Sequence, residues 1–112
     1  MLKVLLLKGL PASGKSTYAK ELLEKEPGRW KRVNKDDLRA MLDNGKWSGL
    51  NEQFILNLRN HLILTSLEAG NNVVVDDTNL HPKHETDIRK MVEQLVPYEN
   101  EPVAKVEVKF FD

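Results

Sequence analysis

The first feature of this sequence that could do chemistry is the glycine-rich segment GLPASGKST at residues 9–17. Its spacing, G-x-x-x-x-G-K-[ST], is typical of loops that bind phosphates through backbone N–H groups. Glycines are needed because side chains would block the phosphates. Lys15 would reach the β- and γ-phosphates, and the hydroxyl of Ser16 would hold Mg²⁺. We predict a nucleoside triphosphate site formed by Gly9, Leu10, Pro11, Ala12, Ser13, Gly14, Lys15, Ser16 and Thr17.

A second candidate segment is NKDDLR at residues 34–39. A kinase for a hydroxyl acceptor needs a group that positions the hydroxyl and accepts its proton. A carboxylate at the end of a strand, across from the phosphate loop, suits that task. Asp36 and Asp37 also have a structural interpretation, one as a helix N-cap and the other as a partner for the helix dipole. Arg39 is by default a solvated helix residue, so the pattern alone leaves both interpretations open.

The third candidate segment is VVVDDTN at residues 73–79. Carboxylates directly after an apolar strand resemble the second acidic element of phosphate-loop proteins, which acts on Mg²⁺ or its waters. Asp, Thr and Asn are also good turn formers, so a simple strand-ending turn is the alternative. Because a phosphate loop is present in the same chain, we favour a functional role.

The elements that must position these segments alternate between strands and helices. Apolar runs and helix start and stop signals carry this pattern. We predict strands at Leu2 to Leu7, Trp30 to Asn34, Val73 to Asp76 and Val103 to Phe111. We predict helices from Gly14 or Lys15 to Lys25, at Leu38 to Leu42, at Asn51 to Ala69 with Asn51 as the cap, and at His81 to Leu95.

This alternation predicts an α/β fold of the phosphate-loop type, with a central parallel sheet of about four strands and helices on both faces. Right-handed crossovers keep successive strands parallel, and ligands bind beyond the carboxyl ends of such strands. The three candidate segments should therefore converge on one edge of the sheet. We expect residues 1–112 to form one domain, with the stripe of Phe54, Ile55, Leu58, Leu62 and Ile63 in the core and His61 half-buried.

Composition limits the possible partners. Lys plus Arg and Asp plus Glu each number 17, so a global field that would attract nucleic acid is absent. The chain has no cysteine, which excludes disulfides and thiolate chemistry. Its apolar start is too short for a membrane span, and no cleavage site follows it. We expect a cytoplasmic protein without a membrane partner.

The combination of GLPASGKST, NKDDLR and DDTNL followed by a helix resembles the kinase domain of bacteriophage 5′-polynucleotide kinase/3′-phosphatase. It is also similar to the wider group of small phosphate-loop kinases with a DTN element. The resemblance runs from Met1 to Asp112 in order and spacing. It implies a kinase that moves the γ-phosphate of ATP, with Mg²⁺, to the 5′-hydroxyl of a DNA or RNA end.

The resemblance also implies roles for single residues. The family's general base falls on Asp36, and its contact with an acceptor-strand phosphate falls on Arg39. The aspartate of its DTN element falls on Asp77, with Thr78 and Asn79 beside it in the acceptor site. The phosphate loop keeps its generic roles.

The chain departs from the family at several points. Lys35 stands where arginine is common, Asp76 adds a second carboxylate of unclear role, and residues 43–50 match no family signature. Family members continue into a helical lid that supplies arginines to the transferred phosphate, and such arginines can be worth ~10³-fold in rate. We expect this chain, tested alone, to bind nucleotide and to be a weak or inactive kinase, as a fragment, a natural truncation or one part of a split enzyme.

Three functions therefore stay open. The first is a polynucleotide 5′-hydroxyl kinase, the second a kinase for a small metabolite, and the third a nucleotide-binding module without catalysis. A basic rim of Lys31, Arg32 and Lys35 favours a phosphodiester acceptor, unless it is simply a set of exposed basic residues. Trp47 is a candidate for contact with the acceptor. An open sheet edge beside the last strand would invite a homo-oligomer.

Overall fold

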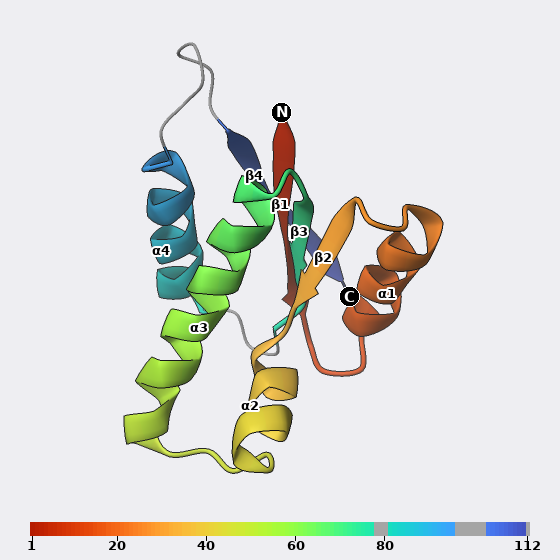
Figure 1. Cartoon of the computed structure of the whole chain (residues 1–112). Helices are drawn as coiled ribbons and strands as arrows, with labels where there is room; N and C mark the ends of the chain where they lie inside the picture. The colour runs from red at the N-terminus through yellow and green to blue at the C-terminus, as the bar shows by residue number, and fades with distance from the viewer. Residues whose placement is uncertain (78–80, 96–102, 112) are drawn as a thin grey trace.

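The computed structural model describes residues 1–77, 81–95 and 103–111. Strands alternate with helices along these ranges, except that two successive helices lie between the second and third strands (Figure 1). The elements are β1 (Leu2–Gly9), α1 (Lys15–Lys25), β2 (Trp30–Val33), α2 (Lys35–Asp43), α3 (Gly49–Glu68), β3 (Asn72–Val75), α4 (Pro82–Glu93) and β4 (Ala104–Phe111).

The strands form one four-stranded sheet in the order β2-β3-β1-β4, and each neighbouring pair is parallel. The two apolar runs lie side by side in its middle, with Val4 opposite Val73 and Leu6 opposite Val75. Strands buried on both faces need such continuous apolar sequences. The predicted parallel sheet is confirmed, and the carboxyl ends of β1, β2 and β3 share one edge.

Helices cover both faces of the sheet, which gives the predicted three layers (Figure 1). Successive residues of β1 alternate between the two faces. Val4 and Leu6 pack with α3 and α4, while Leu5 and Leu7 pack on the side of α1. Since α1 is the one described helix on its side, part of that sheet face is left without a helix over it (Figure 1).

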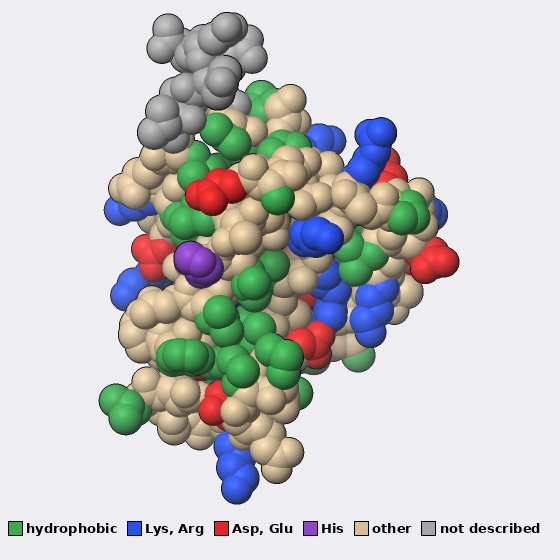
Figure 2. Space-filling view, in the orientation of Figure 1, with side chains coloured by type: hydrophobic (Ala, Val, Ile, Leu, Met, Phe, Trp, Pro, Cys, Tyr) green, Lys and Arg blue, Asp and Glu red, His purple; other side chains and the backbone are tan. Residues whose placement is uncertain are grey.

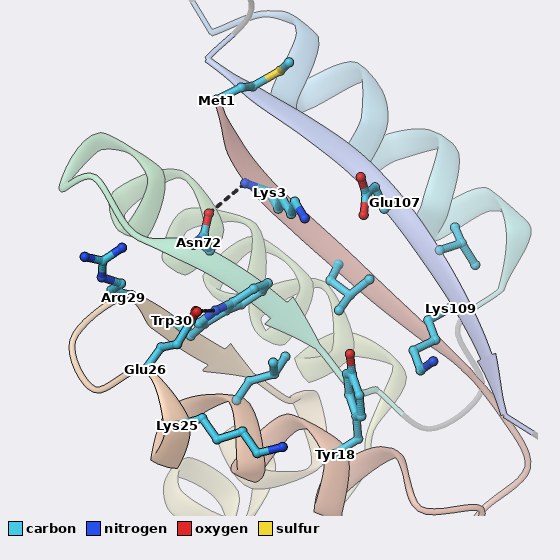
Figure 3. A pocket seen from close by; sticks show the side chains of 13 residues that line it. Met1, Lys3, Tyr18, Lys25, Glu26, Arg29, Trp30, Asn72, Glu107 and Lys109 are labelled. Carbon is cyan, nitrogen blue, oxygen red and sulfur yellow. Dashed lines mark hydrogen bonds between the residues drawn. The ribbon is translucent and has the colours of Figure 1, made fainter.

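The uncovered part of the α1 side contains a cavity of about 600 Å³ (Figure 3). Trp30 is buried at its wall, and the indole Nε1 donates a 2.6 Å hydrogen bond to Glu26. Figure 3 shows Tyr18 and Lys109 at the opposite side of the hollow. None of the residues that line it belongs to the glycine-rich segment, so this cavity is not the predicted nucleotide site.

Two predicted helix starts are wrong. Helix α2 begins at Lys35 and includes both aspartates, because the side chain of Asn34 accepts a 2.9 Å hydrogen bond from the amide of Asp37 and is the N-cap. Helix α3 begins at Gly49, because the hydroxyl of Ser48 accepts from the amide of Asn51 at 3.1 Å. A polar side chain that satisfies an open amide defines the first turn in both cases.

The predicted buried stripe of α3 is partly wrong. Phe54 is 58% exposed and His61 is also exposed, whereas Ile55 and Ile63 are fully buried. The buried face repeats at every fourth residue, and Phe54 and His61 lie off it. Figure 2 shows hydrophobic side chains gathered over the lower half of the molecule, where α2 and α3 lie. The exposed members near this junction are Met41, Leu42, Trp47, Leu50 and Phe54.

A membrane-spanning helix is not found among the described residues, since none of their helices is both long and apolar enough.

Candidate active site

The loop between β1 and α1 takes a conformation that depends on its glycines. Gly9 has φ of 153°, and a Cβ atom there would lie 2.5 Å from the carbonyl oxygen of Phe111. Gly14, the residue before α1, has φ of 100°. Ala12 also adopts the left-handed region, with φ of 63°. Glycine adopts such angles without strain, whereas Ala12 is strained, and strained residues of this kind cluster at ligand sites.

A cavity of about 260 Å³ lies in this loop. Lys15 is only 6% exposed at its wall, and its Nζ donates a 2.6 Å hydrogen bond to the carbonyl oxygen of Gly9. An ammonium group has three N–H donors, so the same lysine can also donate to phosphate oxygens. The cavity is lined by Pro11, Ala12, Gly14, Lys15, Ser16, Thr17 and Asp76.

Asp76 is the carboxylate that meets the phosphate loop. Its side chain is fully buried, and Oδ2 accepts hydrogen bonds from Ser16 Oγ at 2.9 Å and from Arg32 Nε at 2.8 Å. Oδ1 accepts from Asn34 Nδ2 at 3.1 Å. The sequence placed an acidic element at this position but left the role of Asp76 unclear. The sequence feature that could have identified Asp76 as a site residue is its position directly after the last residue of β3.

The donors around Ser16 and Asp76 fit a magnesium ion. Mg²⁺ prefers oxygen ligands and is usually held by one or two protein groups together with substrate phosphates. A serine hydroxyl beside a buried carboxylate supplies this kind of ligand set. Within the described ranges there is no group of three or more His, Cys, Asp or Glu residues that could hold a metal. Any magnesium ion there would therefore take most of its ligands from water or from the nucleotide.

Asp77 points into the protein. It is 1% exposed, its Oδ1 accepts a 2.7 Å hydrogen bond from the amide of Lys35, and its Oδ2 accepts from Arg59 Nη1 at 3.3 Å. Burial raises the pKa of Asp77, against the lowering influence of the Lys35 amide and Arg59. This carboxylate therefore ties the end of β3 to the start of α2. Contact of Asp77 with an acceptor stays a prediction, and Thr78 and Asn79 lie outside the described residues.

Replacing Arg59 with alanine is expected to destabilise the protein by about 3–5 kcal/mol, because the buried charge of Asp77 would lose its cation. Urea unfolding followed by circular dichroism measures this change. Arg89→Ala is the matched control, since its pair with Glu85 is half-exposed and should contribute less than about 1 kcal/mol. Equal decreases in the free energy of unfolding of the two variants would show that the buried Arg59–Asp77 pair stabilises the fold no more than the half-exposed pair does.

Asp36 and Arg39 lie together on α2. The side chain of Asp36 is 57% exposed, and its Oδ1 accepts a 2.8 Å hydrogen bond from Arg39 Nη1. Arg39 is only 13% exposed, because Glu52 at the start of α3 accepts from its Nε and Nη2 at 2.6 to 3.2 Å. The expectation of a solvated Arg39 is therefore wrong. Its guanidinium is held between two carboxylates.

Glu52 is a site residue that the sequence did not reveal. It is 13 positions from Arg39 along the chain, and in sequence it reads as an acidic residue in the first turn of a helix. Burial pushes its pKa upward, but the hydrogen bond to Arg39 and the charges of Lys35 and Arg39 hold the pKa below its ordinary value. Glu52 therefore stays ionised and keeps the Arg39 fork in place.

The lowered pKa predicts an acid-dependent effect of Glu52→Gln. The charged form stabilises the fold above the ordinary value of 4.5, and this contribution is lost as the pH falls through the lower folded pKa. The variant should be less stable than the wild type by about 1 kcal/mol at neutral pH. Urea titrations at neutral pH and near pH 3 should show this difference vanish in acid, and a constant difference would contradict the assignment.

Comparisons with known proteins agree with this geometry. A putative bifunctional polynucleotide kinase/RNA ligase of Autographa californica nuclear polyhedrosis virus is 36% identical over 93 residues, covering 70% of this chain and 13% of that protein. An L-seryl-tRNA(Sec) kinase of Methanococcus maripaludis is 30% identical over 96 residues, covering 81% of this chain and 36% of that protein. The chain thus spans little more than a third of these relatives at most.

Solved structures give the same fold. A chain of the Pnkp1/Rnl/Hen1 complex is 30% identical, with a TM-score of 0.81, and the match covers 99% of this chain and 35% of that one. The APS kinase CysC of Mycobacterium tuberculosis is 23% identical, with a TM-score of 0.67, and the match covers 99% of this chain and 76% of that one. At this identity the similarity supports the fold alone. The predicted resemblance to polynucleotide kinases is confirmed.

The family model described as an AAA domain, AAA_33, matches residues 4–99. That range includes the glycine-rich loop, the start of α2 and the end of β3, which the structure brings to one edge of the sheet. The chain therefore belongs to the AAA_33 family of phosphate-loop domains.

Proposed function

We propose that residues 1–112 form the phosphate-loop kinase domain of a polynucleotide 5′-hydroxyl kinase. The domain would transfer the γ-phosphate of ATP to the 5′-hydroxyl of a DNA or RNA end. One observation carries the proposal. A chain of hydrogen bonds runs from Ser16 in the phosphate loop through Asp76 and Arg32 to Asp37, the neighbour of Asp36. The phosphate loop is thus linked through side chains to the residue next to the candidate base, which supports one shared site.

The phosphate loop would hold the nucleotide. Backbone N–H groups of residues 9–14, apart from Pro11, which has none, and the Nζ of Lys15 would bind the β- and γ-phosphates, with the N-terminus of α1 adding favourable charge. Ser16 and Asp76 would hold the magnesium ion. When bound, Mg²⁺ would neutralise charge on the phosphates.

The start of α2 would hold the acceptor. Asp36 is exposed enough to meet a hydroxyl, and it would accept the proton as the 5′-oxygen bonds to the γ-phosphorus. The bond from that phosphorus to the bridging oxygen of ADP breaks in the same displacement. Arg39, oriented by Glu52, would contact a phosphate of the acceptor strand. Asp77 would act as a positioning residue for this part of α2.

Other acceptors remain a second candidate. One relative is named as an L-seryl-tRNA(Sec) kinase, so kinases similar to this chain differ in the acceptor that their names give. The phosphate loop does not discriminate between acceptors, because it contacts only the nucleotide. The acceptor must therefore be identified directly.

Incubating the chain with γ-labelled ATP decides between the candidates. The acceptors compared are a 5′-hydroxyl oligonucleotide, the same oligonucleotide with a 5′-phosphate, and a panel of small hydroxyl metabolites. We expect label on the 5′-hydroxyl oligonucleotide alone, at a slow rate if the chain needs arginines from a lid. Label on a metabolite instead supports the second candidate. Bound nucleotide without labelled acceptor, even with a lid segment added in trans, supports a binding module.

Two further expectations belong to this proposal. Strand β4 lies at an edge of the sheet, which supports pairing of two chains along it, and light scattering after gel filtration would measure the resulting mass. The proposed use of ATP also makes a cytoplasmic location part of the proposal.

A further inference from the structure

Arg32 contacts three side chains of the candidate site. It projects from β2, and its Nε donates to Asp76 Oδ2 at 2.8 Å while Nη1 donates to Asp37 Oδ2. Its Nη2 donates a long hydrogen bond of 3.5 Å to Ser16 Oγ. The sequence grouped Arg32 with a rim of exposed basic residues. Its side chain is in fact largely buried, against the residues that would hold magnesium.

The hydrogen bonds around Ser16 leave only the lone pairs of its hydroxyl oxygen available to a cation. The proton of the Ser16 hydroxyl points to Asp76, so the oxygen's lone pairs face away from that carboxylate. Arg32 Nη2 approaches these lone pairs. A magnesium ion that binds Ser16 must use the same oxygen, and two positive groups so close together repel each other.

The carboxylate of Asp76 has a matching need for positive charge. It is fully buried, and among the described residues Arg32 is the one basic side chain in an ion pair with it. A buried carboxylate without a cation is costly, whereas either a guanidinium or a metal ion can supply the charge. Asp37 offers the same guanidinium a second partner that is mostly exposed to solvent.

We propose that Arg32 occupies the cation position beside Ser16 and Asp76 until magnesium binds there, and that it then gives up these two contacts while it keeps its ion pair with Asp37. This inference rests on the proposed function, because it assumes that Ser16 and Asp76 hold magnesium. Arg32 is then a positioning residue that sets how strongly magnesium binds. It keeps Asp76 neutralised in the meantime, and its release leaves a positive group beside Asp37, the neighbour of Asp36.

Thermal unfolding without nucleotide gives the first test. Arg32→Gln should unfold at a lower temperature than the wild type, and millimolar Mg²⁺ should raise its unfolding temperature by roughly three times the shift seen in the wild type. Lys31→Gln is the matched control, because Lys31 is the exposed neighbour on the same strand. If Mg²⁺ raised the unfolding temperature of all three proteins equally, the inference would be overturned, and Arg32 would only form a structural ion pair.

Calorimetric titration with ATP gives the second test. The ratio of the Kd in EDTA to the Kd in Mg²⁺ should be about 5–10-fold larger for Arg32→Gln than for the wild type or Lys31→Gln. An unchanged or smaller ratio would overturn the inference. Arg32→Lys keeps the charge without the fork, so it should give an intermediate ratio and replaces Arg32→Gln if that variant fails to fold.

The two tests separate this inference from the proposed function. Suppose that Mg²⁺ without nucleotide raises the unfolding temperature of Arg32→Gln more than that of the wild type, while the wild type does not bind ATP. This result would contradict the nucleotide site and keep the role of Arg32. ATP binding that depends on Lys15, together with equal magnesium effects, would keep the nucleotide site and remove the role of Arg32.

Discussion

Replacing Lys15 with alanine is expected to weaken ATP binding by about 100-fold or more. The ammonium group lies largely buried in the phosphate-loop cavity and already donates to the carbonyl oxygen of Gly9. Losing it removes a charge-assisted contact with the β- and γ-phosphates from a site that excludes much of the solvent. Calorimetric titration with Mg²⁺ and ATP measures the affinity of each protein directly.

The control for this variant is Lys20→Ala, which removes an exposed lysine from the same helix. Its ATP affinity should stay within about twofold of the wild type, since an exposed charge at this distance is screened by salt. Circular dichroism of both variants checks that the fold is kept. An unchanged ATP affinity of a folded Lys15→Ala protein would rule out the phosphate loop as the nucleotide site.

Asp36→Asn is expected to lower the rate of phosphate transfer by about 10²- to 10⁴-fold, because an amide cannot accept the proton of the attacking hydroxyl. Its affinity for ATP should not change, since Asp36 contacts Arg39 and is not among the residues that line the phosphate-loop cavity. Single-turnover transfer to a 5′-hydroxyl oligonucleotide measures the rate, and calorimetry measures the affinity.

Asp37→Asn is the matched comparison, because the two aspartates are adjacent on α2 and both are largely exposed. Asp37 contacts Arg32, and its replacement should slow transfer by less than about tenfold. A larger loss in Asp37→Asn than in Asp36→Asn would exchange the roles of the two residues. Equal rates in the wild type and Asp36→Asn would remove the general base from the proposal.

The fold could be predicted because local sequence and tertiary position agree. The apolar runs at residues 2–7 and 73–75 have no other stable place than the middle of a sheet with both faces covered. The glycine-rich motif then places a helix directly after β1, as the structure has it. Errors arose at helix starts, where a single hydrogen bond accepted by the side chain of Asn34 or Ser48 sets the boundary.

The sequence indicated candidate site residues only where they adjoin strand ends. Lys15, Asp36 and Asp76 follow β1, β2 and β3 in sequence, and parallel strands bring such positions to one edge. Glu52 comes instead from the first turn of the long helix α3, and Arg59 comes from its middle. Their contacts with Arg39 and Asp77 depend on the rotation of α3 against the sheet, which periodicity alone does not fix to one residue.

The most direct test of the account is a crystal structure of the chain with a non-hydrolysable ATP analogue, Mg²⁺ and a short 5′-hydroxyl oligonucleotide. We expect the triphosphate in the loop of residues 9–17, in contact with Lys15, and the 5′-oxygen at about 2.6–3.2 Å from a carboxylate oxygen of Asp36. A triphosphate bound elsewhere, or a bound 5′-end with Asp36 turned away from it, would contradict the account.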